Sequence, residues 1–332
     1  MKTHGCVLLT LALAMTGTAA FADDKPDEKK ADAPAAAVTP QVRTTKHSGT
    51  FGGQRVDYRA TIGETILKSE EGTQKAAIVT TAYVKEPRDT TRPVTFLFNG
   101  GPGSGSVWLQ MGAFGPKRVA IPSDARDDGG PPYPLLDNPD CLLDVSDLVF
   151  IDPPGTGFSH LIGKTEGKEF YGVTADAKAV AEVIRRWLND NGRWNSPKFL
   201  GGESYGTTRS AAVVHQLEGV THNDVGLNGV ILISTVLDFA AGADTPGNEL
   251  SYITNLPSMA ATALFHGKTS APSVEQLVDE ARQFALGPYA AALLQGQRLP
   301  VGERASIRRE LSHFTGLSEA YLELADLRVT PD

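Results

Sequence analysis

The chain has 332 residues and a formal net charge of −8. An acidic balance argues against nucleic-acid binding, which usually requires a basic face. The sequence has only two cysteines and no histidine pair at helical metal-ligand spacing, so it predicts neither a disulfide framework nor a metal site. The glycine-rich segments lack the endings of nucleotide-binding loops, and no cofactor is expected.

The first 22 residues have the pattern of a cleavable signal peptide. Lys2 precedes an apolar core from Val7 to Ala14, and small residues end the segment at Ala20-Phe21-Ala22. The apolar run is shorter than the roughly 20 residues that a membrane span needs. Removal of this segment leaves Cys141 as the one cysteine, and no asparagine lies in an N-x-S/T sequon. We therefore expect export to a periplasm or the medium, in a bacterium.

Residues 23–45, rich in charge, alanine and proline, are predicted to be a disordered linker. Residues 46–250 are expected to form the α/β core. Three stretches of alternating or β-branched residues between Arg55 and Val84 predict antiparallel strands. The apolar runs 93–98 and 147–151 are typical of buried parallel strands.

Two helical regions are predicted. Positions 173–188 carry apolar residues at spacings of three and four, which predicts a helix that packs on the sheet through one face. That face comprises Val173, Ala177, Val180, Ile184 and Trp187. Residues 251–332 read as helices broken by prolines at 257, 272, 288 and 300, and we interpret them as a helical cap insertion that shapes the substrate pocket.

The segment Gly202-Glu203-Ser204-Tyr205-Gly206 has the G-x-S-x-G pattern of a nucleophile elbow. It follows the short apolar strand Phe199-Leu200 and precedes a helix-forming run from Thr207 to Leu217. This context matters because a serine becomes accessible as a nucleophile on a tight strand-to-helix turn. The following helix directs its first amides toward the oxyanion that forms when Ser204 attacks a carbonyl.

Two further segments carry glycines directly after apolar strands. Asn99-Gly100-Gly101-Pro102-Gly103 follows Val94–Phe98, where backbone amides can approach a substrate closely. Asp152-Pro153-Pro154-Gly155-Thr156-Gly157-Phe158-Ser159 follows Val149–Ile151. The glycine loop precedes the elbow by about 100 residues, which is the order expected when both supply halves of an oxyanion hole.

The segments NGGPGSGS, DLVFIDPPGTGFS and GGESYG together resemble the three signature blocks of the serine carboxypeptidases, from about residue 93 to 240. The resemblance implies an α/β-hydrolase fold, with a mostly parallel central sheet and N-terminal antiparallel strands, that removes C-terminal residues from peptides and proteins. It implies that Ser204 is the nucleophile and that the amides of Gly101 and Tyr205 form the oxyanion hole. Asn99, the Gly100 amide and Glu203 would hold the terminal carboxylate of the substrate.

The sequence departs from this family in two places. Family members commonly carry a second glutamate in an E-x-G-P tetrapeptide, where this chain reads Ala113-Phe114-Gly115-Pro116. The glycine loop of the family often continues with a disulfide-forming cysteine, where this chain has Ser104. We therefore expect weaker selectivity for the carboxylate than in the family at large.

A triad also needs an aspartate and then a histidine after the nucleophile. His215 lies on the helix of the elbow, roughly 16 Å along its axis, and cannot reach Ser204. Of the other histidines after Ser204, which are His222, His266 and His313, the last two lie in helix-like stretches without a preceding strand. Asp238 reads as structural. We expect the given sequence to be an inactive fragment whose last strands, aspartate and histidine lie beyond residue 332. An esterase or acyltransferase on the same machinery, and a noncatalytic remnant of the fold, remain alternatives.

Overall fold

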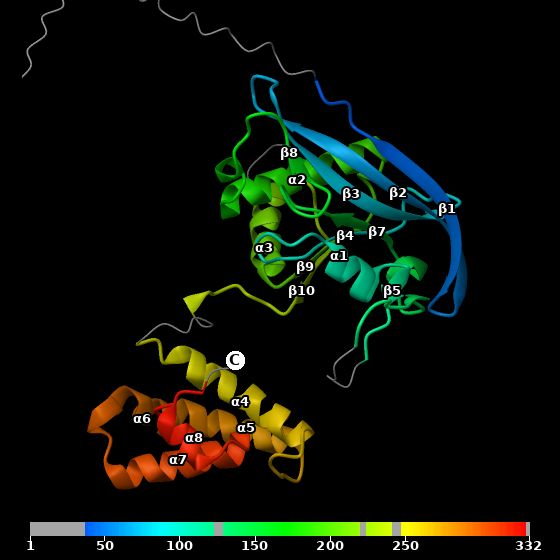
Figure 1. Ribbon diagram of the computed structural model, residues 1–332. Helices are drawn as coiled ribbons and strands as arrows, with labels where there is room; N and C mark the ends of the chain where they lie inside the picture. The colour runs from blue at the N-terminus through cyan, green and yellow to red at the C-terminus, as the bar shows by residue number, and fades with distance from the viewer. Residues whose placement is uncertain (1–36, 123–128, 220–223, 241–246, 330–332) are drawn as a thin grey trace, which may run out of the picture. The chain divides into compact units, whose positions relative to one another are not determined.

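The computed structural model describes residues 37–122, 129–219, 224–240 and 247–329 (Figure 1). The expected signal peptide and the first part of the expected linker lie outside these ranges. The strand β1 begins at Val42, inside the range 23–45 that was predicted to be linker. None of the described helices combines the length and apolar character that a membrane span needs.

One mixed sheet organises the α/β part of the chain. Its strands lie in the order β1-β2-β3-β7-β4-β9-β10, and β8 pairs with β3 outside this path. The strands β1, β2, β3 and β7 pair antiparallel, whereas β7, β4, β9 and β10 pair parallel. Their bounds are β1 (Val42–Phe51), β2 (Gln54–Lys68), β3 (Gln74–Glu86), β4 (Val94–Phe98), β7 (Asp147–Ile151), β8 (His160–Leu161), β9 (Lys198–Glu203) and β10 (Gly229–Ile233).

The predicted α/β class with N-terminal antiparallel strands is confirmed. The region between Arg55 and Val84 differs from the prediction, because it holds parts of two long strands rather than three stretches. Lys68 lies at a shift in the β2 to β3 register, so a local irregularity interrupts one continuous pairing. The third antiparallel strand of this ribbon is β1, which precedes the region.

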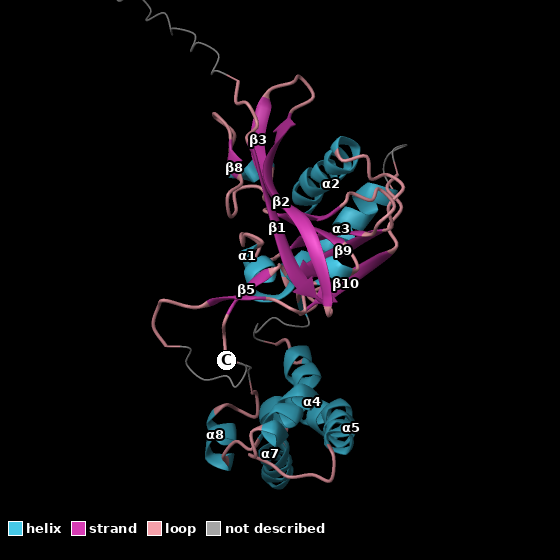
Figure 2. Cartoon of the chain, turned by 90° about the vertical axis from the view of Figure 1, so that its right-hand side faces the viewer, coloured by secondary structure: helices cyan, strands magenta, loops and turns pink. Residues whose placement is uncertain are grey.

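The two central strands bury side chains on both faces, which explains their continuous apolar runs. Phe96 and Val149 pack into a core with the helices α2 (Val173–Asp190) and α3 (Tyr205–Glu218). Leu97 and Phe150 point to the opposite core, which contains Leu109 of α1 (Val107–Leu109). Figures 1 and 2 show α2 and α3 on one face of the sheet and α1 on the other.

Helix α2 confirms most of the predicted apolar face. Ala177, Val180 and Ile184 have no exposed surface, and Trp187 packs edge to face on Phe96 with ring centroids 5.5 Å apart. Val173 is the exception, because 46% of it is exposed. It is the first residue of the helix and follows two exposed residues, so it lies before the buried face begins.

A small two-stranded sheet and short turns complete this part of the chain. The strands β5 (Lys117–Val119) and β6 (Leu135–Asp137) pair antiparallel. A π-helical turn, Gln110–Phe114, continues directly from α1, and a 3-10 turn, Leu142–Asp144, precedes β7. Another 3-10 turn, Gly167–Glu169, precedes α2.

The described residues from 247 onward are helical and have a core of their own, which includes Leu256, Leu277 and Leu311. Pro257 lies inside a helix, contrary to the predicted break, whereas Pro300 caps the start of another. The helices are α4 (Leu250–Phe265), α5 (Val274–Phe284), α6 (Ala290–Gln295), α7 (Val301–Thr315) and α8 (Glu319–Leu324), with a π-helical turn at Ala285–Tyr289 and a 3-10 turn at Gly296–Arg298.

Candidate active site

Ser204 occupies a strained turn between β9 and α3. Its backbone has φ 58° and ψ −125°, a conformation that side-chain-bearing residues rarely adopt. The turn is held from both sides, because the Ser204 N–H donates to Ile233 O at 2.9 Å and the Ser204 carbonyl accepts from the Thr207 N–H at 2.9 Å. The strand, turn and helix thus have the arrangement that presents a nucleophilic serine.

The two glycines of the elbow leave no room for side chains. A Cβ atom at Gly202 would lie 2.0 Å from Gly206 O. One at Gly206 would lie 2.9 Å from Phe98 O, at the end of the neighbouring strand. The G-x-S-x-G pattern therefore reflects close backbone approach within the turn and between the first residues of α3 and the end of β4.

The glycine loop lies directly against the elbow, as the sequence predicted. Phe98 pairs with Gly202 in the parallel ladder, so the loops that follow β4 and β9 meet at the same edge of the sheet. A Cβ atom at Gly100 would lie 2.4 Å from Tyr205 N. Gly101 has φ +103°. The Gly101 loop and the amide of Tyr205 at the start of α3 are therefore brought together beside Ser204.

Asn99 and Glu203 form a polar pair behind this turn. Asn99 is 1% exposed, and its Oδ1 accepts from the Leu109 N–H at 2.9 Å. That bond orients the amide, so Nδ2 donates to Glu203 Oε2 at 3.0 Å. Oε1 of Glu203 accepts no hydrogen bond from any residue that the structure describes. The pair joins two of the residues predicted to bind a substrate carboxylate and leaves one carboxyl oxygen of Glu203 available.

A buried ion pair that the sequence reasoning missed lies next to this pair. Arg209 Nε donates to Asp176 Oδ2 at 2.7 Å, and Arg209 Nη1 donates to the Asn99 carbonyl at 2.5 Å. The guanidinium carbon lies 5.1 Å from the centroid of the Tyr205 ring. Burial raises the pKa of the Asp176 carboxyl, and the Arg209 charge opposes that shift.

The sequence did carry a signal for this ion pair. Asp176 lies four residues before Val180 on the buried face of α2, and Arg209 lies four residues before Val213 on the buried face of α3. A charge at such a position must be paired, because burial of an isolated charge is costly. Two charges of opposite sign on neighbouring helices are therefore candidates for each other.

The third glycine-containing segment acts as a brace for the glycine loop. Asp152 Oδ1 accepts from the Ser106 N–H at 2.7 Å, and Oδ2 accepts from the Phe158 N–H at 3.0 Å. Gly157 has φ +53°, and a Cβ there would lie 2.2 Å from the Asp152 carboxylate. The carboxylate therefore binds its own turn and the end of the glycine loop together.

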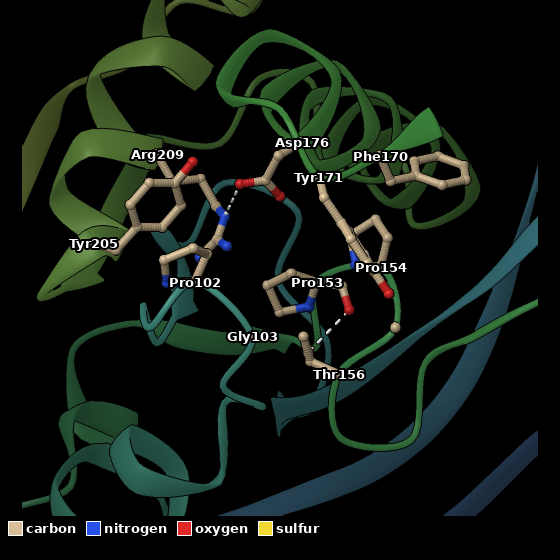
Figure 3. Close-up of a pocket in the computed structure, with 11 residues that line it drawn as sticks. Pro102, Gly103, Pro153, Pro154, Thr156, Phe170, Tyr171, Asp176, Tyr205 and Arg209 are labelled. Carbon is tan, nitrogen blue, oxygen red and sulfur yellow. Dashed lines mark hydrogen bonds and ion pairs between the residues drawn. The ribbon is translucent and has the colours of Figure 1, made fainter. Parts of the chain in front are cut away.

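A cavity of about 290 Å³ lies beside the elbow (Figure 3). Its walls come from the glycine loop, the segment after β7 and the facing sides of α2 and α3. Neither Ser204 nor Glu203 lines it, so the cavity adjoins the nucleophile without containing it. It is lined by Pro102, Gly103, Pro153, Pro154, Gly155, Thr156, Phe170, Tyr171, Asp176, Tyr205 and Arg209.

Within the described ranges no side chain forms a hydrogen bond with Ser204 Oγ. His215 lies on α3, as expected, and His313 lies on α7. His222 lies outside the described residues. Asp238 Oδ1 accepts from the Ala240 N–H at 2.9 Å, which agrees with a structural role for this carboxylate.

The position where a second glutamate was expected is exposed. Ala113 lies in the π-helical turn after α1, and its carbonyl accepts from Asn138 Nδ2 at 2.6 Å. Asn138 also donates to Gly115 O at 2.9 Å, which fixes the end of the turn. The methyl group of Ala113 offers no charge to a ligand.

Comparison with known proteins identifies relatives of this region. The sequence profile of the serine carboxypeptidase family matches residues 81–277. Serine carboxypeptidase-like 16 of Arabidopsis thaliana is 26% identical over 160 residues, which cover 46% of this chain and 35% of that protein. Serine carboxypeptidase-like 44 of the same plant is 31% identical over 126 residues, which cover 36% of this chain and 23% of that protein. The chain thus spans only about a third or less of these relatives.

Among solved structures, the chain is similar to brefeldin A esterase, a bacterial homologue of human hormone-sensitive lipase. The two share 14% sequence identity with a TM-score of 0.33, over 68% of this chain and 48% of the esterase. The mixed sheet with a parallel core, N-terminal antiparallel strands and flanking helices is an α/β-hydrolase-like fold.

Proposed function

The chain belongs to the serine carboxypeptidase family, and on this basis we propose that it releases C-terminal residues from peptides through an acyl-enzyme on Ser204. One observation carries the proposal. A half-buried carboxyl, Glu203, is the residue next to the elbow serine and is oriented by the buried amide of Asn99. A carboxyl at this position can donate to a substrate carboxylate when it is protonated, which supports recognition of a free C-terminus.

The chemical step follows from the elbow. Ser204 Oγ attacks the scissile carbonyl, and the amides of Gly101 and Tyr205 stabilise the oxyanion. The Ser204 proton passes to a general base, for which the family implies a histidine oriented by an aspartate, and then to the leaving amine. Water hydrolyses the ester in the second half of the reaction. We do not assign the base to any histidine that the structure describes.

Carboxylate recognition follows from the chemistry of Glu203. Two carboxylates at hydrogen-bond distance repel, so Glu203 can hold the substrate terminus only as the neutral acid, which donates through its free oxygen. Asn99 retains a second amide N–H, and the Gly100 N–H is the third group that the resemblance to the family implies. The proposal therefore predicts that peptides with a free C-terminal carboxylate are preferred over the matched C-terminal amides.

The test uses the complete gene product and matched peptides that end in a free carboxylate or in an amide. We expect release of the C-terminal residue from the acids, poor cleavage of the amides, and labelling of Ser204 by a fluorophosphonate. The Ser204→Ala variant should show neither turnover nor labelling. Labelling of a different serine, or equal cleavage of acids and amides, would contradict the proposal.

An esterase or acyltransferase is the second candidate. The observation that favours it is Ala113, because an exposed methyl group stands where a second carboxyl would strengthen recognition of a peptide terminus. The elbow and oxyanion hole support any acyl transfer. Turnover of small acyl esters that exceeds that of every peptide acid would favour this candidate.

We also propose that the protein is exported through residues 1–22 and acts in a periplasm or outside the cell. The support is the pattern of the sequence alone, a short apolar core after a lysine and before small residues. Determination of the N-terminal residue of the protein recovered from its host tests this. An N-terminus near residue 23 is expected, and retention of Met1 would contradict it.

A further inference from the structure

Two successive peptide groups after β4 are held by different parts of the protein. The first joins Asn99 to Gly100, and its carbonyl accepts from Arg209 Nη1 at 2.5 Å. The second joins Gly100 to Gly101, and its carbonyl accepts from the Ser104 N–H at 3.1 Å. The N–H of the first peptide belongs to the proposed carboxylate site, and the N–H of the second belongs to the proposed oxyanion hole. The two amides therefore have separate anchors.

Anchoring the Asn99 carbonyl fixes the direction of the Gly100 N–H. The peptide group is planar, and in the trans form, which this bond has, its C=O and N–H point in opposite directions. The Gly100 N–H therefore points away from Arg209. A Cβ at Gly100 would lie 2.4 Å from Tyr205 N, so the position requires glycine, which also lets the peptide group rotate more freely. A charge-assisted hydrogen bond to its carbonyl opposes that rotation.

Arg209 is itself held in one place. It is 2% exposed, and its Nε donates to Asp176 Oδ2 at 2.7 Å, which joins α3 to α2 (Figure 3). Its guanidinium carbon lies 5.4 Å from the centroid of the Phe98 ring and 5.1 Å from that of the Tyr205 ring. The face of an aromatic ring attracts a cation at such distances. A carboxylate, a carbonyl and two rings thus fix the guanidinium.

The same anchor constrains the Asn99 side chain. Asn99 Oδ1 accepts from the Leu109 N–H, and Nδ2 donates to Glu203 Oε2. With its main-chain carbonyl on Arg209, Asn99 is held at both the backbone and the side-chain amide. Two of the three groups that the resemblance implies for the substrate carboxylate, the Asn99 amide and the Gly100 N–H, therefore depend on one arginine.

We propose that Arg209, held by Asp176, is a positioning residue that fixes the Asn99–Gly100 peptide group for recognition of the terminal carboxylate of the substrate. The assignment rests on the proposed carboxypeptidase function and separates recognition from chemistry within one loop. Loss of the Arg209 anchor weakens binding of the carboxylate. The Gly101 amide keeps its anchor on the Ser104 N–H and continues to stabilise the oxyanion.

The main test replaces Arg209 with lysine in the complete gene product. Lysine keeps the positive charge, but an ammonium group cannot reproduce the planar fork that contacts both Asp176 and the Asn99 carbonyl. With matched peptide acids and amides, the ratio of kcat/KM for the acid to that for the amide should fall about tenfold, through KM of the acid. The kcat for the acid and the turnover of p-nitrophenyl acetate should stay within about twofold of the wild type, since neither depends on the Gly100 amide.

Arg193→Lys is the matched control. Arg193 is also buried, pairs with Asp147 and donates to a main-chain carbonyl, that of Arg92. These contacts lie at the opposite ends of the parallel strands, so the control should lose stability without a change in the ratio. Fluorophosphonate titration of Ser204 corrects both proteins for the folded fraction. An equal fall of the ratio in both variants overturns the proposal, because a general loss of rigidity would then explain it.

A structure of the Ser204→Ala protein with a bound peptide acid requires no change at Arg209. The Gly100 N–H should lie within hydrogen-bond distance of the ligand carboxylate while the Asn99 carbonyl still accepts from Arg209. A carboxylate bound without the Gly100 amide, or an Asn99 carbonyl turned away from Arg209, overturns the proposal even if Arg209→Lys does not fold.

The same measurements distinguish failure of this proposal from failure of the proposed function. If the wild type prefers the acids and Arg209→Lys retains the full preference, the positioning role is wrong and the carboxypeptidase stands. Equal cleavage of acids and amides by the wild type overturns both. A preference for acids that is reduced in Arg209→Lys and intact in Arg193→Lys supports the positioning role.

Discussion

Buried charged groups at the two ends of the parallel strands differ in how many of their hydrogen-bonding atoms have partners within the protein. At the start of β7, Asp147 is 1% exposed, and its Oδ2 accepts from Arg193 Nη1 at 2.5 Å. Its Oδ1 accepts from Arg92 Nε at 3.1 Å and from the Lys85 N–H at 3.0 Å. Arg193 donates in addition to Ser196 Oγ and to the Arg92 carbonyl. Both oxygens of the Asp147 carboxylate and all three guanidinium nitrogens of Arg193 are thus hydrogen-bonded within the protein.

At the opposite ends of β4 and β9 the polar groups are only partly used. Glu203 keeps one carboxyl oxygen, and the Asp176 and Arg209 pair keeps one acceptor and one donor, in the described part of the chain. Asp147 and Arg193 are buried, and so are Asp176 and Arg209, so burial alone does not distinguish structure from function. The second pair differs because it lines a cavity, where a ligand can reach its unused groups.

The largest expected effect is on kcat, at Ser204 in the turn after β9. Ser204→Ala should lower kcat of the complete enzyme by roughly 10⁴-fold to 10⁶-fold, because the hydroxyl acts only in the chemical step. The midpoint of thermal unfolding should change little, since no described residue binds Ser204 Oγ. Steady-state kinetics and thermal melts of the same preparation check both statements. A large loss of stability would show that the Ser204 hydroxyl stabilises the fold and would contradict this prediction.

The next largest expected effect is on the free energy of unfolding, at Asp147 at the start of β7. Asp147→Asn should lower the free energy of unfolding by about 3–5 kcal/mol, because Arg193 would remain buried without its counter-charge. The control is Glu86→Gln, which removes the partly exposed partner of Arg59 and should cost about 1 kcal/mol or less. Denaturant unfolding measures both. In the folded fraction of Asp147→Asn, kcat/KM should equal that of the wild type. A lower kcat/KM would contradict the conclusion that the Asp147 cluster only stabilises the fold.

A smaller effect separates recognition from chemistry. Glu203→Ala should raise KM for peptides with a free C-terminus about tenfold, because the substrate carboxylate loses a hydrogen-bond partner. Glu203→Gln should raise KM less, since an amide also donates to a carboxylate. The matched C-terminal amides are the control. Equal KM values for the peptide acids in the wild type and in both variants would remove Glu203 from the carboxylate site and favour the esterase.

The smallest effect concerns a buried group that belongs to neither cluster. Burial raises the pKa of the Cys141 thiol from 9.0 to about 11. Because the folded pKa exceeds the unfolded one, the neutral thiol contributes stability that is present below pH 9 and is lost as the pH rises to about 11. The unfolding temperature of the wild type should therefore fall more steeply over this window than that of Cys141→Ala. Parallel pH profiles would show that the thiol is not buried in solution.

The sequence by itself determined the features that depend on local backbone geometry. The elbow, the glycine loop and their order were readable because glycines at Gly202 and Gly100 are required by close backbone approach, which few sequences satisfy. The buried face of α2 was readable from its period, since Ala177, Val180 and Ile184 recur at helical spacing. The juxtaposition of Asn99 and Glu203 was available only from the resemblance to a family.

The tertiary structure decided what depends on packing between segments distant in sequence. The Asp176 and Arg209 pair, the bracing role of Asp152 and the cavity between them exist because α2, α3 and two loops meet at one edge of the sheet. A sequence pattern gives the face of each helix but not the distance between two faces. Whether a buried charge finds a partner, and whether that partner leaves capacity for a ligand, is fixed by three-dimensional contacts alone.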